Sequence, residues 1–141
     1  MGYRLQYYFV TLFDLVTKNT MPPIKIGKIK TQMIEKRGWL VGQFMKDPEF
    51  KDENIEIYYK TFPVGDTDDK LHYHPEGKEY MVVLAGKARF RIGDELLTLE
   101  KGDYIAIPSG IADQIVDVLE EFTIIGVRYP SIPNNKVFIE G

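Results

Sequence analysis

Apolar and polar residues alternate along much of the chain after residue 22. In segment 87–92, Lys87, Arg89 and Arg91 alternate with apolar residues, as in a strand with one solvent face and one core face. Segment 80–85 is apolar throughout, so we expect cover on both of its faces. Short segments of this kind, separated by Gly and Pro, indicate an all-β sandwich or barrel rather than βαβ units. The expected strands are 24–29, 39–44, 55–62, 79–85, 87–92, 95–99, 104–107, 113–118 and 122–128.

The first 21 residues follow a different pattern. Apolar residues recur there at three- and four-residue spacing, from Leu5 to Val16, which predicts an amphipathic helix docked on the domain. A membrane-surface helix is disfavoured because the polar side is not a Lys/Arg face. Pro22 and Pro23 end the helical segment. We therefore expect a helical extension over residues 1–21 and a single barrel domain over residues 22–141, with Met21 as an alternative start.

Composition narrows the classes of function. A chain of 141 residues suits one domain, and a net charge of −3 gives no basic footprint for nucleic acid. Without cysteine, disulfides, thiolate ligands and a cysteine nucleophile are excluded. The apolar run 7–13 is too short to span a bilayer and lacks a signal-peptide cleavage site. We expect a cytoplasmic protein with neither a nucleic-acid nor a membrane partner.

Candidate chemistry is concentrated in one short segment. His72 and His74 are the two histidines of the chain, and on a strand residues two apart share a face. Glu79 follows after a Pro- and Gly-containing segment that permits a tight reversal. Two imidazoles and a carboxylate suit Zn, Fe, Mn, Ni or Cu. Taken alone, such a pair is more typical of surface or hydrogen-bonded histidines.

The segment around these residues resembles the first motif of the cupin superfamily. The run His72-x-His74-x4-Glu79-x6-Gly86 has the spacing of that motif, although the leading glycine, Gly65, lies one residue too far upstream. A second segment resembles cupin motif two. It contains, at the motif's spacing, Gly102, Pro108, Gly110, Asp113 and Asp117.

The resemblance covers roughly residues 55–128 and implies a double-stranded β-helix (jelly-roll) barrel, with the motif-one ligands facing inward. It also implies a homodimer, in agreement with the doubly apolar segment 80–85. It does not imply one function, because the superfamily includes dioxygenases, isomerases, epimerases, decarboxylases, storage proteins and sugar-binding regulators.

Asp113 is the main departure from the family pattern, because it stands where motif two has a histidine; Asp117 stands where the motif has asparagine. If Asp113 is a ligand, the site holds two nitrogens and two carboxylates, which favours Fe, Mn or Zn over Cu(I). If it falls short of the metal, His72, His74 and Glu79 form the two-histidine, one-carboxylate set typical of non-haem Fe(II) oxygen chemistry. In a third interpretation motif two has decayed and no metal binds.

The leading hypothesis is a metal-dependent enzyme, of dioxygenase or lyase/isomerase type, that acts on a small polar metabolite. Acid–base catalysis would then fall to Glu79, Asp113 or a metal-bound water. The alternatives are a non-catalytic cupin that binds a small molecule, and a metal-free isomerase resembling the sugar-nucleotide members of the superfamily, with a histidine as base.

Other polar and aromatic residues are weaker candidates. By alternation, Tyr73 and Tyr80 point away from the histidines and Glu79. Trp39 and Phe44 are expected in the core or a subunit interface. The acidic cluster lacks EF-hand spacing and is expected to be a solvated turn; it comprises Asp52, Asp66, Asp68 and Asp69.

Overall fold

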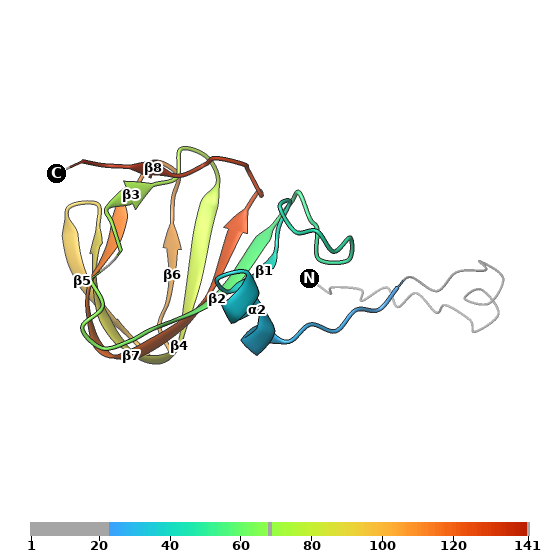
Figure 1. The fold of residues 1–141 in the computed structure, drawn as a ribbon. Helices are drawn as coiled ribbons and strands as arrows, with labels where there is room; N and C mark the ends of the chain where they lie inside the picture. Colours follow the sequence, from blue (N-terminus) through green and yellow to red (C-terminus); the bar gives the residue numbers. More distant parts are fainter. Residues whose placement is uncertain (1–22, 68, 141) are drawn as a thin grey trace, which may run out of the picture.

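The computed structural model describes residues 23–67 and 69–140, and most of their regular structure is β-sheet (Figure 1). A single short helix, α2 (Ile29–Glu35), occurs in these ranges and packs beside β1 and β2. The strands are β1 (Trp39–Val41), β2 (Glu56–Phe62), β3 (His72–Tyr73), β4 (Lys78–Ile92), β5 (Glu95–Glu100), β6 (Tyr104–Ile107), β7 (Asp113–Tyr129) and β8 (Val137–Phe138).

Two long antiparallel strands, β4 and β7, run through both layers of the barrel (Figure 1). Residues 78–85 of β4 pair with residues 123–129 of β7 in the first layer, whose order is β1-β2-β7-β4-β6. Residues 87–92 pair with residues 113–120 in the second layer, whose order is β8-β3-β7-β4-β5. This confirms the predicted all-β, double-stranded β-helix fold.

β4 bends between the layers at Gly86. This glycine has φ 81°, a conformation that side chains with a Cβ rarely adopt, and a Cβ there would collide with the carbonyl of Glu121. The register between β4 and β7 shifts on both sides of the bend, as expected at β-bulges. The sequence predicted four separate strands for these segments, whereas the structure joins them into two continuous bent strands.

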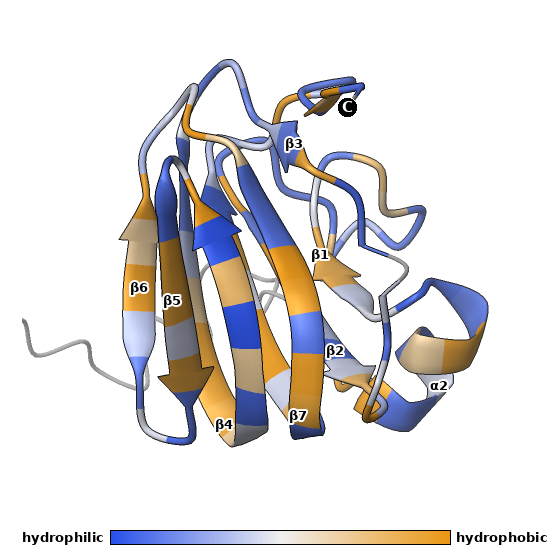
Figure 2. Ribbon diagram, turned by 90° about the vertical axis from the view of Figure 1, so that its left-hand side faces the viewer, coloured by the Kyte–Doolittle hydropathy of each residue, from blue (hydrophilic) through white to orange (hydrophobic). Residues whose placement is uncertain are grey.

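The hydrophobic core lies between the two layers. Phe90, Phe122, Val83 and Val118 are its largest fully buried side chains. The predicted alternation in 87–92 is confirmed, because Ala88 and Phe90 are buried. The polar stripes visible along the strands in Figure 2 have this same two-residue period.

The outer face of segment 80–85 is not covered by the described residues. Tyr80, Val82 and Leu84 are 44%, 44% and 38% exposed, respectively. The described residues do not supply the cover predicted for this face, and the homodimer stays a prediction.

The N-terminal part of the barrel domain differs from the prediction. The expected strand 24–29 does not form; these residues are irregular until α2 begins, and Ile24 and Ile26 are exposed. Their alternation fits a strand, but no neighbouring strand pairs with them in the described part of the chain. The predicted helix over residues 1–21 lies outside the described residues. Within them, no helix is long and apolar enough to cross a membrane.

Candidate metal centre

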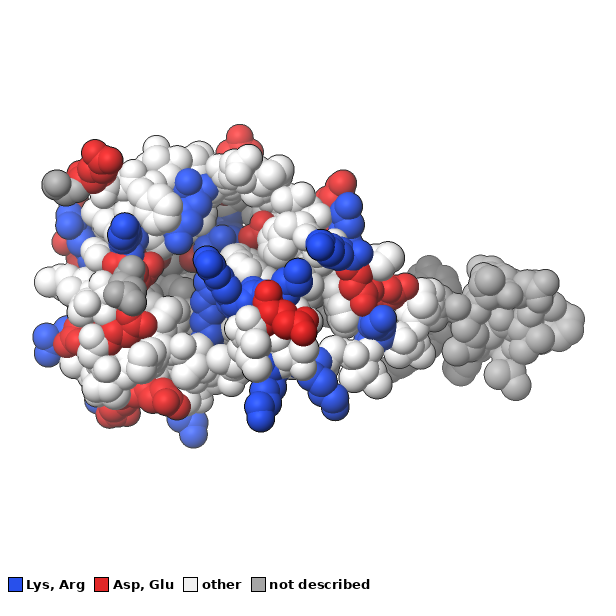
Figure 3. All heavy atoms as spheres, viewed as in Figure 1, with Lys and Arg blue, Asp and Glu red and all other residues white. Residues whose placement is uncertain are grey.

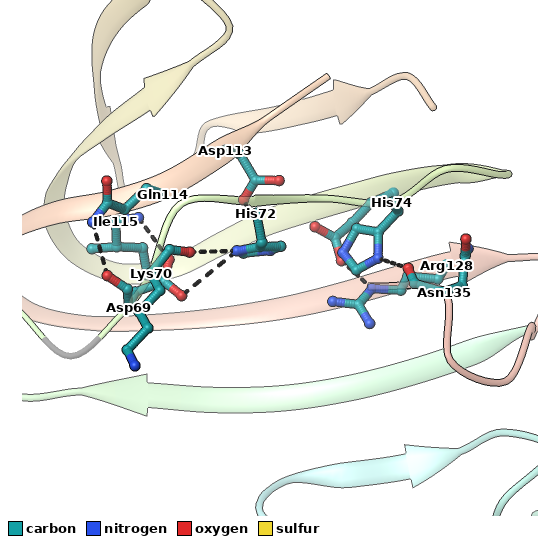
Figure 4. Close-up of polar contacts among 10 residues, drawn as sticks. Asp69, Lys70, His72, His74, Asp113, Gln114, Ile115, Arg128 and Asn135 are labelled. Atoms are coloured by element: carbon teal, nitrogen blue, oxygen red, sulfur yellow. Dashed lines mark hydrogen bonds and ion pairs between the residues drawn. The ribbon is translucent and has the colours of Figure 1, made fainter. Parts of the chain in front are cut away.

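β3 carries the first histidine into the interior of the barrel. His72 lies directly opposite Asp113 in the β3–β7 pairing, and its Nε2 is 3.6 Å from Asp113 Oδ1. His74 follows β3, and its ring centroid lies 5.3 Å from that of His72 (Figure 4). All three side chains are buried. The two histidines therefore share an inward face, as their spacing predicted.

Backbone carbonyls orient both imidazoles. His72 Nδ1 lies 2.7 Å from the carbonyl of Lys70, and His74 Nδ1 lies 2.5 Å from that of Asn135 (Figure 4). A carbonyl can only accept, so each Nδ1 carries the proton and each neutral ring keeps its lone pair on Nε2. Burial lowers the pKa of His72, and it is the main cause that lowers the pKa of His74 to about 4. Neutral imidazoles held in this way are the usual state of metal-ligating histidines.

Two buried polar atoms of this group have no hydrogen-bond partner among the described residues: His74 Nε2 and Asp113 Oδ2. Leaving such atoms unpaired costs about 1–3 kcal/mol each. Burial, followed by the negative charge of Glu79, raises the pKa of Asp113 to about 7. A bound cation would satisfy both atoms and favour the ionised carboxylate.

Glu79 is held by an arginine that the sequence did not single out. Glu79 and Arg128 lie opposite each other in the β4–β7 pairing, and Arg128 Nε donates to Glu79 Oε2. Arg128 Nη1 is also 3.7 Å from Glu56 Oε2, and Glu56 Oε1 accepts from Ser131 Oγ at 3.1 Å. Arg128 thus joins two buried carboxylates.

The predicted ligands are therefore gathered only in part. No group of three or more His, Asp or Glu side chains in residues 23–67 and 69–140 is close enough to hold a metal ion. Glu79 nevertheless lines the same inner cavity as His72 and Asp113. The donor types suit a divalent ion, since they comprise two imidazole lone pairs and a carboxylate oxygen of Asp113. Their positions in the described ranges do not bring three of them to one point.

Two hollows that share lining residues lie beside this site. The inner cavity, of about 80 Å³, is lined by Lys60, His72, Asp113 and Arg128, among others. An outer pocket of about 380 Å³ is lined by Trp39, Phe44 and His74, among others, and shares Arg128 and Lys136 with the inner cavity. Figure 3 shows a hollow near the middle of one face, with Lys and Arg side chains gathered around it. The site thus combines candidate ligands with positive charge.

Strand alternation could have identified two pocket residues that the sequence analysis missed, Lys60 and Arg128. Glu56, Tyr58, Lys60 and Phe62 occupy every second position of β2, and Tyr58, Lys60 and Phe62 all line the inner cavity. A charged residue in such an inward series signals a polar pocket. The same reasoning applied to β7 points to Arg128, which follows Ile124 and Gly126 at two-residue steps.

Two weaker interpretations are corrected by the structure. Asp69 is not part of a merely solvated turn, because its Oδ2 accepts the N–H of Ile115 at 2.8 Å and its Oδ1 lies 4.0 Å from His72 Nδ1. Trp39 packs against the core as expected but also lines the outer pocket together with Phe44, which is exposed. Tyr80 is 44% exposed, in agreement with its predicted outward direction.

Comparison with known proteins agrees with this architecture. Residues 58–113 match the family model described as "Cupin domain", and a search of curated proteins found no match. An uncharacterised conserved protein with a double-stranded β-helix domain from Klebsiella pneumoniae has a TM-score of 0.54 and 21% identity, over 63% of this chain and 77% of that one. At this identity the likeness shows the fold alone.

Two solved enzymes are also similar. The DMSP lyase DddQ from Ruegeria pomeroyi has a TM-score of 0.58 and 25% identity, over 65% of this chain and 47% of that one. An oxalate decarboxylase from B. subtilis has a TM-score of 0.53 and 23% identity, over 62% of this chain and 24% of that one. The matched part spans less than half the length of either enzyme.

Proposed function

We propose that this chain, whose residues 58–113 match the cupin-domain family model, binds a divalent metal ion through His72, His74 and Asp113 and is a metal-dependent enzyme. The observation that carries the proposal is the pair of neutral imidazoles, each fixed through Nδ1, beside the unpaired Asp113 Oδ2. Fe, Mn and Zn are the candidate ions for such nitrogen and oxygen donors.

The reaction we favour is of the lyase type, on a small polar metabolite. The lyase and the decarboxylase among the similar structures support this choice over a dioxygenase. A bound divalent ion would supply Lewis-acid polarisation of a substrate oxygen. The protein's own residues would exclude water from the inner cavity and orient the substrate there.

Glu79 is the proton acceptor in this proposal. Its carboxylate lies in the wall of the inner cavity, and the guanidinium of Arg128 orients it. Arg128 is thus a positioning residue. Tyr58 lines the same cavity, and its pKa is raised well above the usual value, chiefly by burial. The Tyr58 hydroxyl therefore stays protonated and can donate a hydrogen bond to a substrate oxygen.

A metal-free binding protein is the second candidate, and one observation favours it. Glu79 pairs with Arg128, so no three ligating side chains converge in the described ranges. In that case His72 and His74 would contact the ligand directly. The same experiment separates the two candidates.

The test is elemental analysis of tag-free protein and of variants purified identically. We expect near-stoichiometric metal in the wild type, loss in a His72→Ala/His74→Ala double variant and reduced content in Asp113→Asn. Glu79→Gln should keep its metal and lose turnover; loss of metal from Glu79→Gln would instead make Glu79 a fourth ligand. Absence of metal from the wild type, even after reconstitution with Fe, Mn and Zn, would refute the proposal in favour of the binding protein.

A further inference from the structure

Lys60 is a half-buried cation with no salt-bridge partner among the described residues. Its side chain lines the inner cavity, and its ammonium makes no hydrogen bond or salt bridge with the residues that the structure describes. Its close neighbours are the rings of Trp39 and Tyr58, whose centroids are 5.2 and 5.0 Å from Nζ. Burial lowers the pKa of Lys60, and the positive charges of Arg128 and Lys136 lower it further.

The other charges of the described residues around the cavity act on Lys60 from a distance and do not pair with it. Beyond the effect of burial, Arg128 and Lys136 lower its pKa, whereas Glu79 and Asp69 raise it. Arg128 lies between Glu79 and Glu56, so its charge and theirs are largely engaged with one another. The nearest ring to the ammonium of Lys136 is Phe138, at 5.1 Å. Asp69 and Glu79 line the same cavity and offset part of the positive charge, but neither forms a salt bridge with Lys60 or Lys136 in the described part of the chain. The two ammonium groups are therefore left to attract a small anion.

The size of the two hollows restricts the ligand. A cavity of about 80 Å³ admits a small group, and the outer pocket of about 380 Å³, which shares Arg128 and Lys136 with it, leaves room for the rest of a molecule. A planar, singly charged carboxylate suits this space better than a phosphate dianion, because Asp113 and Glu79 also line the inner cavity and would repel a second negative charge.

We propose that Lys60, together with Lys136, binds the carboxylate group of a small organic acid in the inner cavity. The inference rests on the proposed function, because it names the class of substrate on which the proposed enzyme acts. Lys60 is then a specificity-determining residue. Anion binding by Lys60 does not itself require a metal ion, so the two proposals can fail separately.

The test is a titration of the full chain with acetate, propionate and oxalate, and with propionamide and inorganic phosphate as comparisons. Trp39 is the single tryptophan of the chain and lies beside Lys60, so its fluorescence reports on the site; calorimetry gives the affinity. We expect saturable binding of carboxylates and none of propionamide. Equal or tighter binding of phosphate, or equal binding of the amide, would overturn the carboxylate assignment.

Three variants test the role of the side chain. Lys60→Met should weaken carboxylate binding by roughly tenfold to a hundredfold, the usual effect of losing a hydrogen bond to a charged group. Lys60→Arg should restore most of it. Lys101→Met, at an exposed turn position outside both hollows, should bind as the wild type does. Undiminished binding by Lys60→Met would refute the inference.

A stability measurement separates binding from a structural role. Removal of a half-buried charge that makes no salt bridge with the described residues should leave the midpoint of thermal unfolding of ligand-free Lys60→Met unchanged or raise it. A marked fall would show that Lys60 serves chiefly to pack on Trp39 and Tyr58, and would count against the inference. Titrations with chelator-treated and metal-reconstituted protein show which proposal fails: Lys60-dependent binding without metal supports this inference alone.

Discussion

Replacement of Asp113 by asparagine should stabilise the metal-free protein at neutral pH. The pKa of Asp113 is raised from 3.8 to about 7, so the folded state favours the protonated acid. Below pH 3.8 the acid is protonated in both states and its contribution to stability is fully present; the contribution is lost as the pH rises through 7. The shift of about three units corresponds to a loss of about 4 kcal/mol above pH 7.

Asparagine is neutral at every pH and has nearly the same shape, so it escapes this loss. We expect Asp113→Asn to match the wild type near pH 4 and to exceed its free energy of unfolding by up to about 4 kcal/mol at pH 8. Urea denaturation of chelator-treated protein at pH steps from 4 to 8.5 measures the difference. Asp94→Asn, in the exposed turn after β4, is the matched control and should show no such divergence.

Added metal should make the wild type more stable to unfolding than Asp113→Asn, the reverse of the order expected without metal. An ionised Asp113 is the proposed ligand, so added Mn or Zn should stabilise the wild type more than Asp113→Asn, and increasingly so above pH 7. A difference between the metal-free proteins that stays constant from pH 4 to 8.5, or a destabilising Asp113→Asn, would refute the electrostatic reasoning.

Three further changes test other parts of the structure. Gly126→Ala should cost about 1–3 kcal/mol in urea denaturation, because its Cβ would overlap the ring of Tyr58; an unchanged midpoint would contradict the observed packing. Glu79→Gln should lower the free energy of unfolding by about 3–5 kcal/mol, because it breaks the buried ion pair with Arg128. An unchanged free energy of unfolding would show that the charge of Glu56 is sufficient to neutralise Arg128. Val82→Lys, on the outer face of β4, should convert the predicted homodimer to monomer in light scattering, and a wild-type monomer at all concentrations would refute that prediction.

The spacing of the histidines was sufficient to predict their placement, because a strand fixes the direction of residues two apart. His72 and His74 share the barrel interior for that reason. The partner of Glu79 could not be read in the same way. Arg128 lies 49 residues further along the chain, and only the register between β4 and β7 brings the two together.

The local pattern also failed where it carried no information about neighbours. Ile24 and Ile26 alternate with polar residues as a strand would, yet no strand of the described residues pairs with them. Conversely, the inward position of Lys60 was available from the alternation in β2. The absence of a salt-bridge partner for Lys60 among the described residues could not be predicted from the sequence, because it depends on side chains from β2, β7 and the segment before β8.

The shared strands β4 and β7 also bear on how this barrel can tolerate changes in chain length. A deletion of one residue between Gly86 and Ile92 would turn the later half of β4 inside out while the earlier half, with Glu79, kept its pairing. Insertions there would be equally disruptive. The segment after β7 is different, because it supplies Asn135 and Lys136 to the pocket from outside the strand ladders. Variation in the length of that loop could therefore alter the choice of ligand while the barrel that carries His72 and His74 stayed intact.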